Sequence, residues 1–114
     1  MELLLVQTKQ LFQFGEKKII IIGRSPSCDF LIHSRLISRI HVTLVISDLG
    51  CILNDGDLKS DRYSSNGIKM NGRLIDPPSS QILKNGDEFE LSPQHLLKFF
   101  DIKKLGKDSE PTLS

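Results

Sequence analysis

Turn-forming residues divide the sequence into short apolar segments, and this feature constrains the fold more than any other. Each segment is only a few residues long and is followed by Gly, Pro, Asn, Asp or Ser. The most apolar segment contains four consecutive isoleucines, Ile19 to Ile22, and β-branched residues disfavour a helix. Short strands joined by tight turns are typical of all-β proteins, and we expect a β-sandwich.

The turn pattern predicts about ten strands over about 100 residues. Asn71-Gly72 is the strongest hairpin signal, and Asp48-Leu49-Gly50 and Lys84-Asn85-Gly86 mark two further turns. The isoleucine segment is expected to be buried on both faces, and the last segment also fits a helical pattern. The expected strands cover residues 3–8, 10–14, 18–23, 30–32, 41–47, 51–54, 68–70, 73–75, 81–83, 87–91 and 96–101.

Length and charge limit the class of protein. A chain of 114 residues fits one domain, and its 15 basic and 14 acidic residues leave a net charge of +1. This balance argues against binding to nucleic acid or a membrane surface through bulk positive charge. No apolar stretch approaches the roughly 20 residues of a membrane helix, and the N-terminus lacks the positive region of a signal peptide. We therefore expect a cytoplasmic protein.

Two segments depart from the pattern of strands and turns. Residues 55–67 are polar and form a longer connection than the usual 4 to 6 residues or so, which indicates a mobile or a functional loop. From Lys103 onward the composition is typical of disorder. We therefore expect a domain at residues 1–102 and a disordered tail or linker at residues 103–114, in which Thr112 is a candidate phosphorylation site.

The sequence contains few candidates for a metal or a covalent cross-link. Cys28 and Cys51 form no C-x-x-C pair, and we expect two free thiols. Asp55, Asp57 and Asp61 leave open a loose calcium site, although Asn66 stands where an EF-hand loop needs Glu. We expect no cofactor and no metal.

An enzyme is a weaker interpretation than a binding protein. The chain has three histidines, His33, His41 and His95, but no G-x-S-x-G elbow, P-loop or H-E-x-x-H motif. A small β-sandwich is also a poor host for a buried nucleophile. We expect no catalysis, and we interpret His41 as a structural residue whose ring binds loop backbone groups.

Three short motifs at the ends of expected strands carry groups that bind anions or peptides. Gly23 permits a sharp exit from the isoleucine strand, and the guanidinium of Arg24 suits a bidentate grip on phosphate. A hydroxyl and a second guanidinium follow each other at Ser38-Arg39. Asn66, which follows Ser65, has an amide with both a donor and an acceptor. Each motif alone is also explained by a turn or a solvated charge.

Taken in this order, the motifs resemble the forkhead-associated (FHA) domain, a module that recognises phosphothreonine. The resemblance covers residues 3–101 and implies an eleven-stranded β-sandwich whose binding loops cluster at one end. It departs from the family pattern at Ser65 and Ile68, where Thr is frequent, and at residues 55–63, which are longer than usual and contain Arg62. The motifs that carry it are Gly23-Arg24, residues 28–32, Ser38-Arg39-Ile40-His41, residues 64–72 and residues 83–87.

The resemblance also implies a role for individual residues. Arg24 and Ser38 would hold the phosphate with help from Ser65. Arg39 would be a second cation near the ligand, and Asn66 would fix the peptide backbone. The residues expected to shape the loops are Gly23, His41 and Gly67.

The function implied is a phosphothreonine-dependent adaptor in kinase signalling. Its partner would be a protein that carries phosphothreonine, as a substrate of a Ser/Thr kinase does. An alternative left open is a phosphate-independent scaffolding or oligomerisation domain that binds through a sheet face of the same fold.

Overall fold

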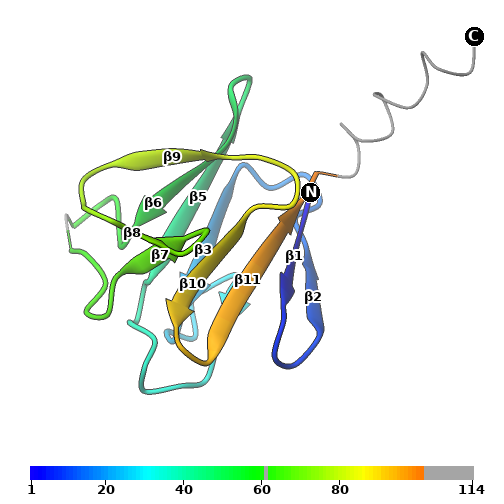
Figure 1. The fold of residues 1–114 in the computed structure, drawn as a ribbon. Coiled ribbons are helices and arrows are strands. Elements are labelled where there is room, and N and C mark those ends of the chain that lie inside the picture. The colour runs from blue at the N-terminus through cyan, green and yellow to red at the C-terminus, as the bar shows by residue number, and fades with distance from the viewer. Residues whose placement is uncertain (61, 102–114) are drawn as a thin grey trace, which may run out of the picture.

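The computed structural model describes residues 1–60 and 62–101, which form eleven strands and no helix (Figure 1). Six strands form one sheet in the order β2-β1-β11-β10-β7-β8, and five form the other in the order β4-β3-β5-β6-β9. The bounds are β1 Glu2–Leu5, β2 Gln10–Gln13, β3 Ile19–Gly23, β4 Phe30–Leu31, β5 Val42–Ser47, β6 Gly50–Asp55, β7 Ile68–Met70, β8 Arg73–Ile75, β9 Ser80–Leu83, β10 Glu88–Ser92 and β11 His95–Phe100. The all-β sandwich and its eleven strands are as expected.

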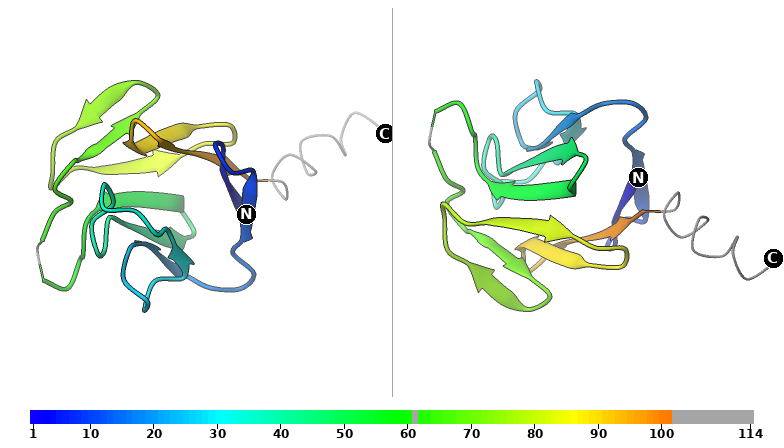
Figure 2. Two further views of the ribbon diagram at one scale, coloured as in Figure 1. Left: turned by 90° about the horizontal axis from the view of Figure 1, so that it is seen from below. Right: turned by 90° about the horizontal axis from the view of Figure 1, so that it is seen from above.

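The core lies between the two sheets, which face each other as layers (Figure 2). Because side chains alternate across a strand, every second residue points inward. Leu97 and Phe99 of β11 and Phe89 of β10 enter from one sheet, and Ile20 and Ile22 of β3 enter from the other. The last segment is therefore a strand, and its helical pattern is overruled by pairing with β1 and β10.

The prediction that the isoleucine segment is buried on both faces is wrong. Ile20 and Ile22 are fully buried, but Ile19 is 54% exposed and Ile21 is only partly buried. Burial on both faces needs a layer on each side of the sheet, and among the described residues β3 has such a layer on one side only.

The start of β1 and the end of β11 lie at a different end of the sandwich from the connections that matter below. In Figure 1 the start of β1 and the end of β11 lie together, as their antiparallel pairing requires. The β5–β6 turn projects at the top, whereas the β4–β5 connection runs along the bottom of the view. The β3–β4, β4–β5 and β6–β7 connections, which hold the predicted binding residues, are thus separated from the start of β1 and the end of β11.

Several expectations concern the chain outside these strands. The predicted tail at residues 103–114, with Thr112, lies outside the described residues, and the boundary at residue 102 stays a prediction. No helix long and apolar enough to cross a membrane occurs in the part of the chain that is described. Cys28 and Cys51 are free thiols as expected, and burial raises the pKa of Cys51 to about 12.

Candidate functional site

Three connections between strands form a groove of about 590 Å³ at one end of the sandwich. They are the β3–β4, β4–β5 and β6–β7 connections, so segments far apart in the sequence meet there. All five predicted binding residues line this groove. Its lining comprises Arg24, Ser25, Ser27, Arg35, Leu36, Ile37, Ser38, Arg39, Ile40, Asp57, Ser60, Arg62, Tyr63, Ser65 and Asn66.

Arg24 is held at the groove by its backbone and by part of its side chain. Its N–H donates to the carbonyl of Ser38 at 3.0 Å, and its Nε donates to the carbonyl of Ile37 at 3.0 Å. The guanidinium has five N–H donors, and this contact uses one. Within residues 1–60 and 62–101 the terminal nitrogens have no protein partner. They are available to an anion in a fixed orientation.

Gly23 is required because the β4–β5 loop passes directly over it. A Cβ at this position would collide with the carbonyl of Arg39 and would lie 2.9 Å from the carbonyl oxygen of Ser38. The backbone of Gly23 is not in the left-handed region, so its role differs from the sharp exit proposed from the sequence. The absence of a side chain lets the loop that carries Ser38 and Arg39 approach the end of β3.

Ser38 and Ser65 connect two of the loops. The hydroxyl of Ser38 accepts a hydrogen bond from the N–H of Ser65 at 2.9 Å. Because that Oγ acts as an acceptor, its own proton remains to be donated. The two hydroxyls and Arg24 therefore supply neutral and charged donors to the same groove.

His41 lies beneath the groove and is fully buried. Its Nδ1 accepts the N–H of Ser38 at 3.0 Å, so Nε2 carries the proton and donates to the carbonyl of Gly67 at 2.9 Å. Burial lowers the pKa of His41, although the bond to Gly67 opposes the shift. The neutral ring thus ties the β4–β5 loop to the β6–β7 loop.

Asn66 and Gly67 form the end of the β6–β7 loop. Gly67 has a φ of +75°, which glycine adopts without strain. The Nδ2 of Asn66 donates to the carbonyl of Leu36 at 2.7 Å, a bond that crosses the groove wall between two loops. Its Oδ1 has no partner in the described parts of the chain. The Nδ2 half of the amide therefore ties the two loops together, and the Oδ1 half is open to a ligand as far as the described residues go.

The long polar segment after β6 is folded as a small hairpin in the part that is described. The N–H of Asp57 donates to the carbonyl of Arg62 at 2.9 Å, and these two residues form an isolated antiparallel bridge. Gly56 is also needed here, because a Cβ would collide with the carbonyl of Arg62. This segment forms one wall of the groove and brings Arg62 and Tyr63 to it.

Two acidic residues of this segment, Asp55 and Asp57, accept hydrogen bonds from protein groups. The two carboxylate oxygens of Asp55 accept from the N–H of Ser64 at 2.6 Å and from its hydroxyl at 3.0 Å. The N–H of Lys59 and the hydroxyl of Ser60 hold the pKa of Asp57 below its usual range. A calcium ion would have to displace these bonds, and Asp61 lies outside the described residues.

The charge lining the groove is strongly positive, although the whole chain is nearly neutral. Four arginines and one acid, Asp57, line it among the described residues. Sequence analysis missed Arg35 and Tyr63. The position of Arg35, three residues before Ser38, was a usable signal, because a short connection keeps both near the same strand end.

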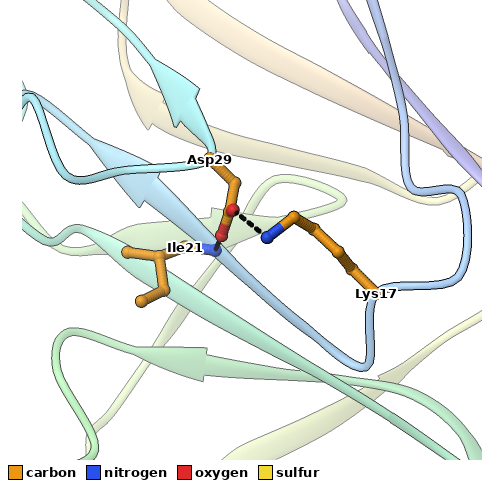
Figure 3. A network of polar contacts seen from close by, with 3 residues as sticks. All are labelled: Lys17, Ile21 and Asp29. Atoms are coloured by element: carbon orange, nitrogen blue, oxygen red, sulfur yellow. Dashed lines mark hydrogen bonds and ion pairs between the residues drawn. The ribbon is translucent and has the colours of Figure 1, made fainter.

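The β3–β4 connection, which forms one wall of the groove, is anchored by Asp29, the residue directly before β4. Its carboxylate bonds Lys17 Nζ at 2.8 Å and accepts the N–H of Ile21 of β3 at 2.8 Å (Figure 3). Burial alone would raise the pKa of Asp29, but Lys17 and the N–H of Ile21 outweigh it and hold the pKa below its usual range. These contacts fix the β4 end of the β3–β4 connection to β3.

The chain is similar to known proteins in both sequence and structure. A sequence model of the FHA domain matches residues 20–92. The serine/threonine-protein kinase RAD53 of Saccharomyces cerevisiae is 35% identical over 75 residues, which are 63% of this chain but only 8% of that kinase. The chain thus spans a small part of the length of this relative.

Two solved structures have a similar fold. The crystal structure of the Slr1951 protein from Synechocystis has a TM-score of 0.65 and is 32% identical, covering 80% of this chain and 81% of its own. The N-terminal FHA domain of S. cerevisiae Rad53p, solved in complex with a phosphothreonine peptide, has a TM-score of 0.74 and is 20% identical. That comparison covers 93% of this chain and 97% of the Rad53p domain. Since the family model matches well over half of the chain, the resemblance is confirmed, and the protein belongs to the FHA domain family.

Proposed function

We propose that this protein is a phosphothreonine-dependent interaction module that docks onto a phosphorylated partner and has no catalysis of its own. One observation supports this most directly. Arg24, Ser38 and Ser65 come from three separate connections, line one groove and are linked through hydrogen bonds. A phosphothreonine brings about −1.5 to −2 charges and three acceptor oxygens, which match a guanidinium and two hydroxyls.

In this proposal each groove residue has a separate role. Arg24 and Ser38 hold the phosphate, and Ser65 donates a further hydrogen bond. Arg39, which is exposed at the same groove, adds a second positive charge. The unoccupied Oδ1 of Asn66 accepts a backbone N–H of the bound peptide. The shaping residues described above hold these groups in place.

The class of partner follows from the ligand chemistry and from the relatives. The solved FHA domain of Rad53p holds a phosphothreonine peptide. We extend this to the present chain and propose a partner protein phosphorylated on threonine by a Ser/Thr kinase. Binding that depends on phosphate is then removed by treatment of the partner with phosphatase.

The proposal is tested by Arg24→Ala, with Arg73→Ala as a matched control. Losing a charge-assisted phosphate contact costs about 1.5–3 kcal/mol, which is at least a tenfold loss of affinity. Arg73 is an exposed arginine on β8 that does not line the groove, so its truncation leaves affinity unchanged. Affinity is measured with a phosphothreonine peptide library by fluorescence anisotropy, and circular dichroism checks folding. A folded Arg24→Ala protein that binds normally contradicts the phosphate role.

One observation favours a second candidate function, a phosphate-independent scaffolding or oligomerisation domain. Ile19, Val45, Ile52 and Ile82 lie opposite one another across four strands, on the outer face of the β3–β5–β6–β9 sheet. Ile19 and Ile82 are 54% and 52% exposed. Sedimentation of the wild type and of Ile82→Lys separates the two functions, because only the scaffolding function predicts self-association that the lysine abolishes.

A further inference from the structure

Another hollow, of about 620 Å³, lies beside the β5–β6 turn. In Figure 1 this turn projects at the top, away from the β4–β5 connection that lines the groove. Its volume falls within the range of about 300–1,000 Å³ that is typical of ligand sites. We call it the β5–β6 hollow, and the lining residues that matter here are Asp48, Leu49, Gly50, Ile82, Lys84 and Asp101.

Two apolar side chains of the β5–β6 hollow are open to solvent. Leu49, in the β5–β6 turn, is 73% exposed, more than any other large apolar side chain of the described residues. Ile82 of β9 is also exposed, and its Cγ2 lies 3.8 Å from the position that a Cβ on Gly50 would take. Because Gly50 has no side chain, the space beside Ile82 stays open. The hollow therefore offers an apolar surface to a further group.

The chain leaves β11 directly at this hollow. Asp101 follows β11 and lines the hollow, and its N–H donates to the Oδ1 of Asn85 in the β9–β10 connection at 2.9 Å. This bond fixes the point from which the chain continues. Residues 102–105 come next, with the sequence Ile-Lys-Lys-Leu, and four residues span at most about 13–14 Å. Both aliphatic side chains of this segment are therefore within reach of the hollow.

The charges of the segment and of the hollow are complementary. Residues 102–107 contain three lysines and no acid, and the acids of the tail come only after them. The hollow is lined by two acids, Asp48 and Asp101, against one base, Lys84. The carboxylate of Asp48 forms no ion pair or hydrogen bond within residues 1–60 and 62–101. A segment that is both aliphatic and basic thus suits this surface.

We propose that residues 102–105 dock in the β5–β6 hollow of the same molecule. Ile102 and Leu105 cover the apolar surface of Leu49 and Ile82, and the two lysines between them lie near Asp48. A weak contact is sufficient, because a short tether to Asp101 gives an effective concentration in the millimolar range. The docked segment holds the chain that follows β11 at the end of the sandwich away from the groove. This inference does not depend on the phosphothreonine function.

A double-mutant cycle in the full chain tests the contact. Leu49→Ser and Leu105→Ser each remove one side of it, and we expect each to lower the melting temperature by about 3–5 °C. The double variant should melt no lower than the less stable single variant, because both substitutions remove the same contact. Leu11→Ser is the matched control, since Leu11 is an exposed leucine of β2 outside the hollow. Its effect should add to that of Leu105→Ser.

Methyl resonances in NMR spectra give a readout that does not depend on stability. Leu105→Ser should shift the methyl signals of Ile82 and leave those of Leu11 unchanged. Replacing both lysines, with Lys103→Glu and Lys104→Glu, should shift the Ile82 signals in the same direction. Raised salt should also move them in that direction in the wild type, because it screens exposed charges.

Three results would overturn the proposal. Unchanged Ile82 signals in Leu105→Ser would show that the segment does not reach the hollow. Additive effects of Leu49→Ser and Leu105→Ser on the melting temperature would show that the two leucines do not share a contact. An Ile82 shift that grows with protein concentration would assign the hollow to the segment of a second copy, and docking within one molecule would then be wrong.

Discussion

Two Asn-Gly turns lie five positions apart in this chain, and the fold uses them differently. At Asn71-Gly72, both residues have positive φ, +50° and +86°, and the turn simply joins β7 to β8. At Asn66-Gly67 only the glycine has positive φ, +75°, and the turn ends the long loop at the groove.

The hydrogen bonds of the two asparagines explain this difference. Asn71 accepts the N–H of Glu88 at 2.9 Å and donates to the carboxylate of Asp87 at 3.3 Å, which fastens one turn to the start of β10. Asn66 reaches Leu36, and Gly67 accepts a bond from buried His41. One turn stabilises a sheet edge, whereas the other joins two loops of the groove, and the Oδ1 of its asparagine has no partner within residues 1–60 and 62–101. The same dipeptide therefore closes a hairpin in one place and borders the proposed binding groove in the other.

The largest expected effect comes from removing the buried support of the second turn. His41→Ala leaves the N–H of Ser38 and the carbonyl of Gly67 without partners, and it opens a cavity. At about 1–3 kcal/mol for each unsatisfied buried group, we expect a loss near 3 kcal/mol in the free energy of unfolding. Chemical denaturation measures it. A loss below about 1 kcal/mol would show that water replaces the ring and that the loops are held by other contacts.

The two asparagines provide a matched pair with opposite outcomes. Asn71→Ala removes two hydrogen bonds and places alanine at positive φ, so we expect a loss of about 2 kcal/mol in stability and unchanged peptide affinity. Asn66→Ala removes one exposed bond and a proposed peptide acceptor. We expect a loss of about 1 kcal/mol or less in stability and at least a fivefold loss of affinity.

Thermal melts and anisotropy on the same two samples give both quantities. Equal effects of the two substitutions on affinity would remove the distinction between the turns and the proposed role of Asn66.

The lowered pKa of His41 makes the stability of the protein depend on pH. Burial holds this pKa below its unfolded value of about 6.5, so the unfolded chain binds more protons than the folded one as the pH falls below 6.5. The stability that depends on a neutral His41 is fully present at pH values above the unfolded pKa. It is lost as the pH falls from the unfolded pKa towards the folded pKa. His95, whose pKa burial also lowers, adds to the same trend.

Unfolding measured between pH 8 and pH 5 should therefore show declining stability, with a smaller decline in His41→Gln than in the wild type. An identical decline in the variant would show that His41 does not titrate in this range. Peptide binding also weakens below about pH 6 because the phosphate loses its second charge, so unfolding is measured without peptide.

The sequence predicts the strands well because their signals are local. The turn residues and the alternation of apolar side chains depend on near neighbours, and strands such as Ile68–Met70 and Arg73–Ile75 begin and end where expected. The predicted burial of Ile19 is wrong because burial depends on the number of layers in the fold, and no local sequence pattern indicates that number.

The site is predictable in part for a similar reason. The order of the motifs and the family resemblance predict that Arg24, Ser38 and Asn66 lie together. The geometry of the groove, however, also depends on contacts between distant segments. Gly23 is needed because of a backbone 16 positions later, as the approach of Arg39 shows. The position of Arg62 depends on a hairpin in a segment that departs from the family pattern. The approach of Arg39 to Gly23 is a long-range contact that appears only in the folded chain, and the hairpin is a local contact for which the family pattern has no counterpart.

The smallest expected effect compares the two glycines of these turns. Both have positive φ, so alanine at either site is strained by about 1 kcal/mol, offset in part by lower entropy of the unfolded chain. A Cβ at Gly72 meets nothing within 4 Å, whereas one at Gly67 lies 3.2 Å from the Cδ1 of Leu74. Leu74 is 55% exposed and can move aside, so Gly67→Ala should cost only a few tenths of a kcal/mol more than Gly72→Ala.

Only Gly67→Ala should also weaken phosphopeptide binding, because its strain falls on the loop that carries Asn66. Paired denaturation and binding measurements test this, and equal affinity in the two variants would show that the groove tolerates strain at its edge.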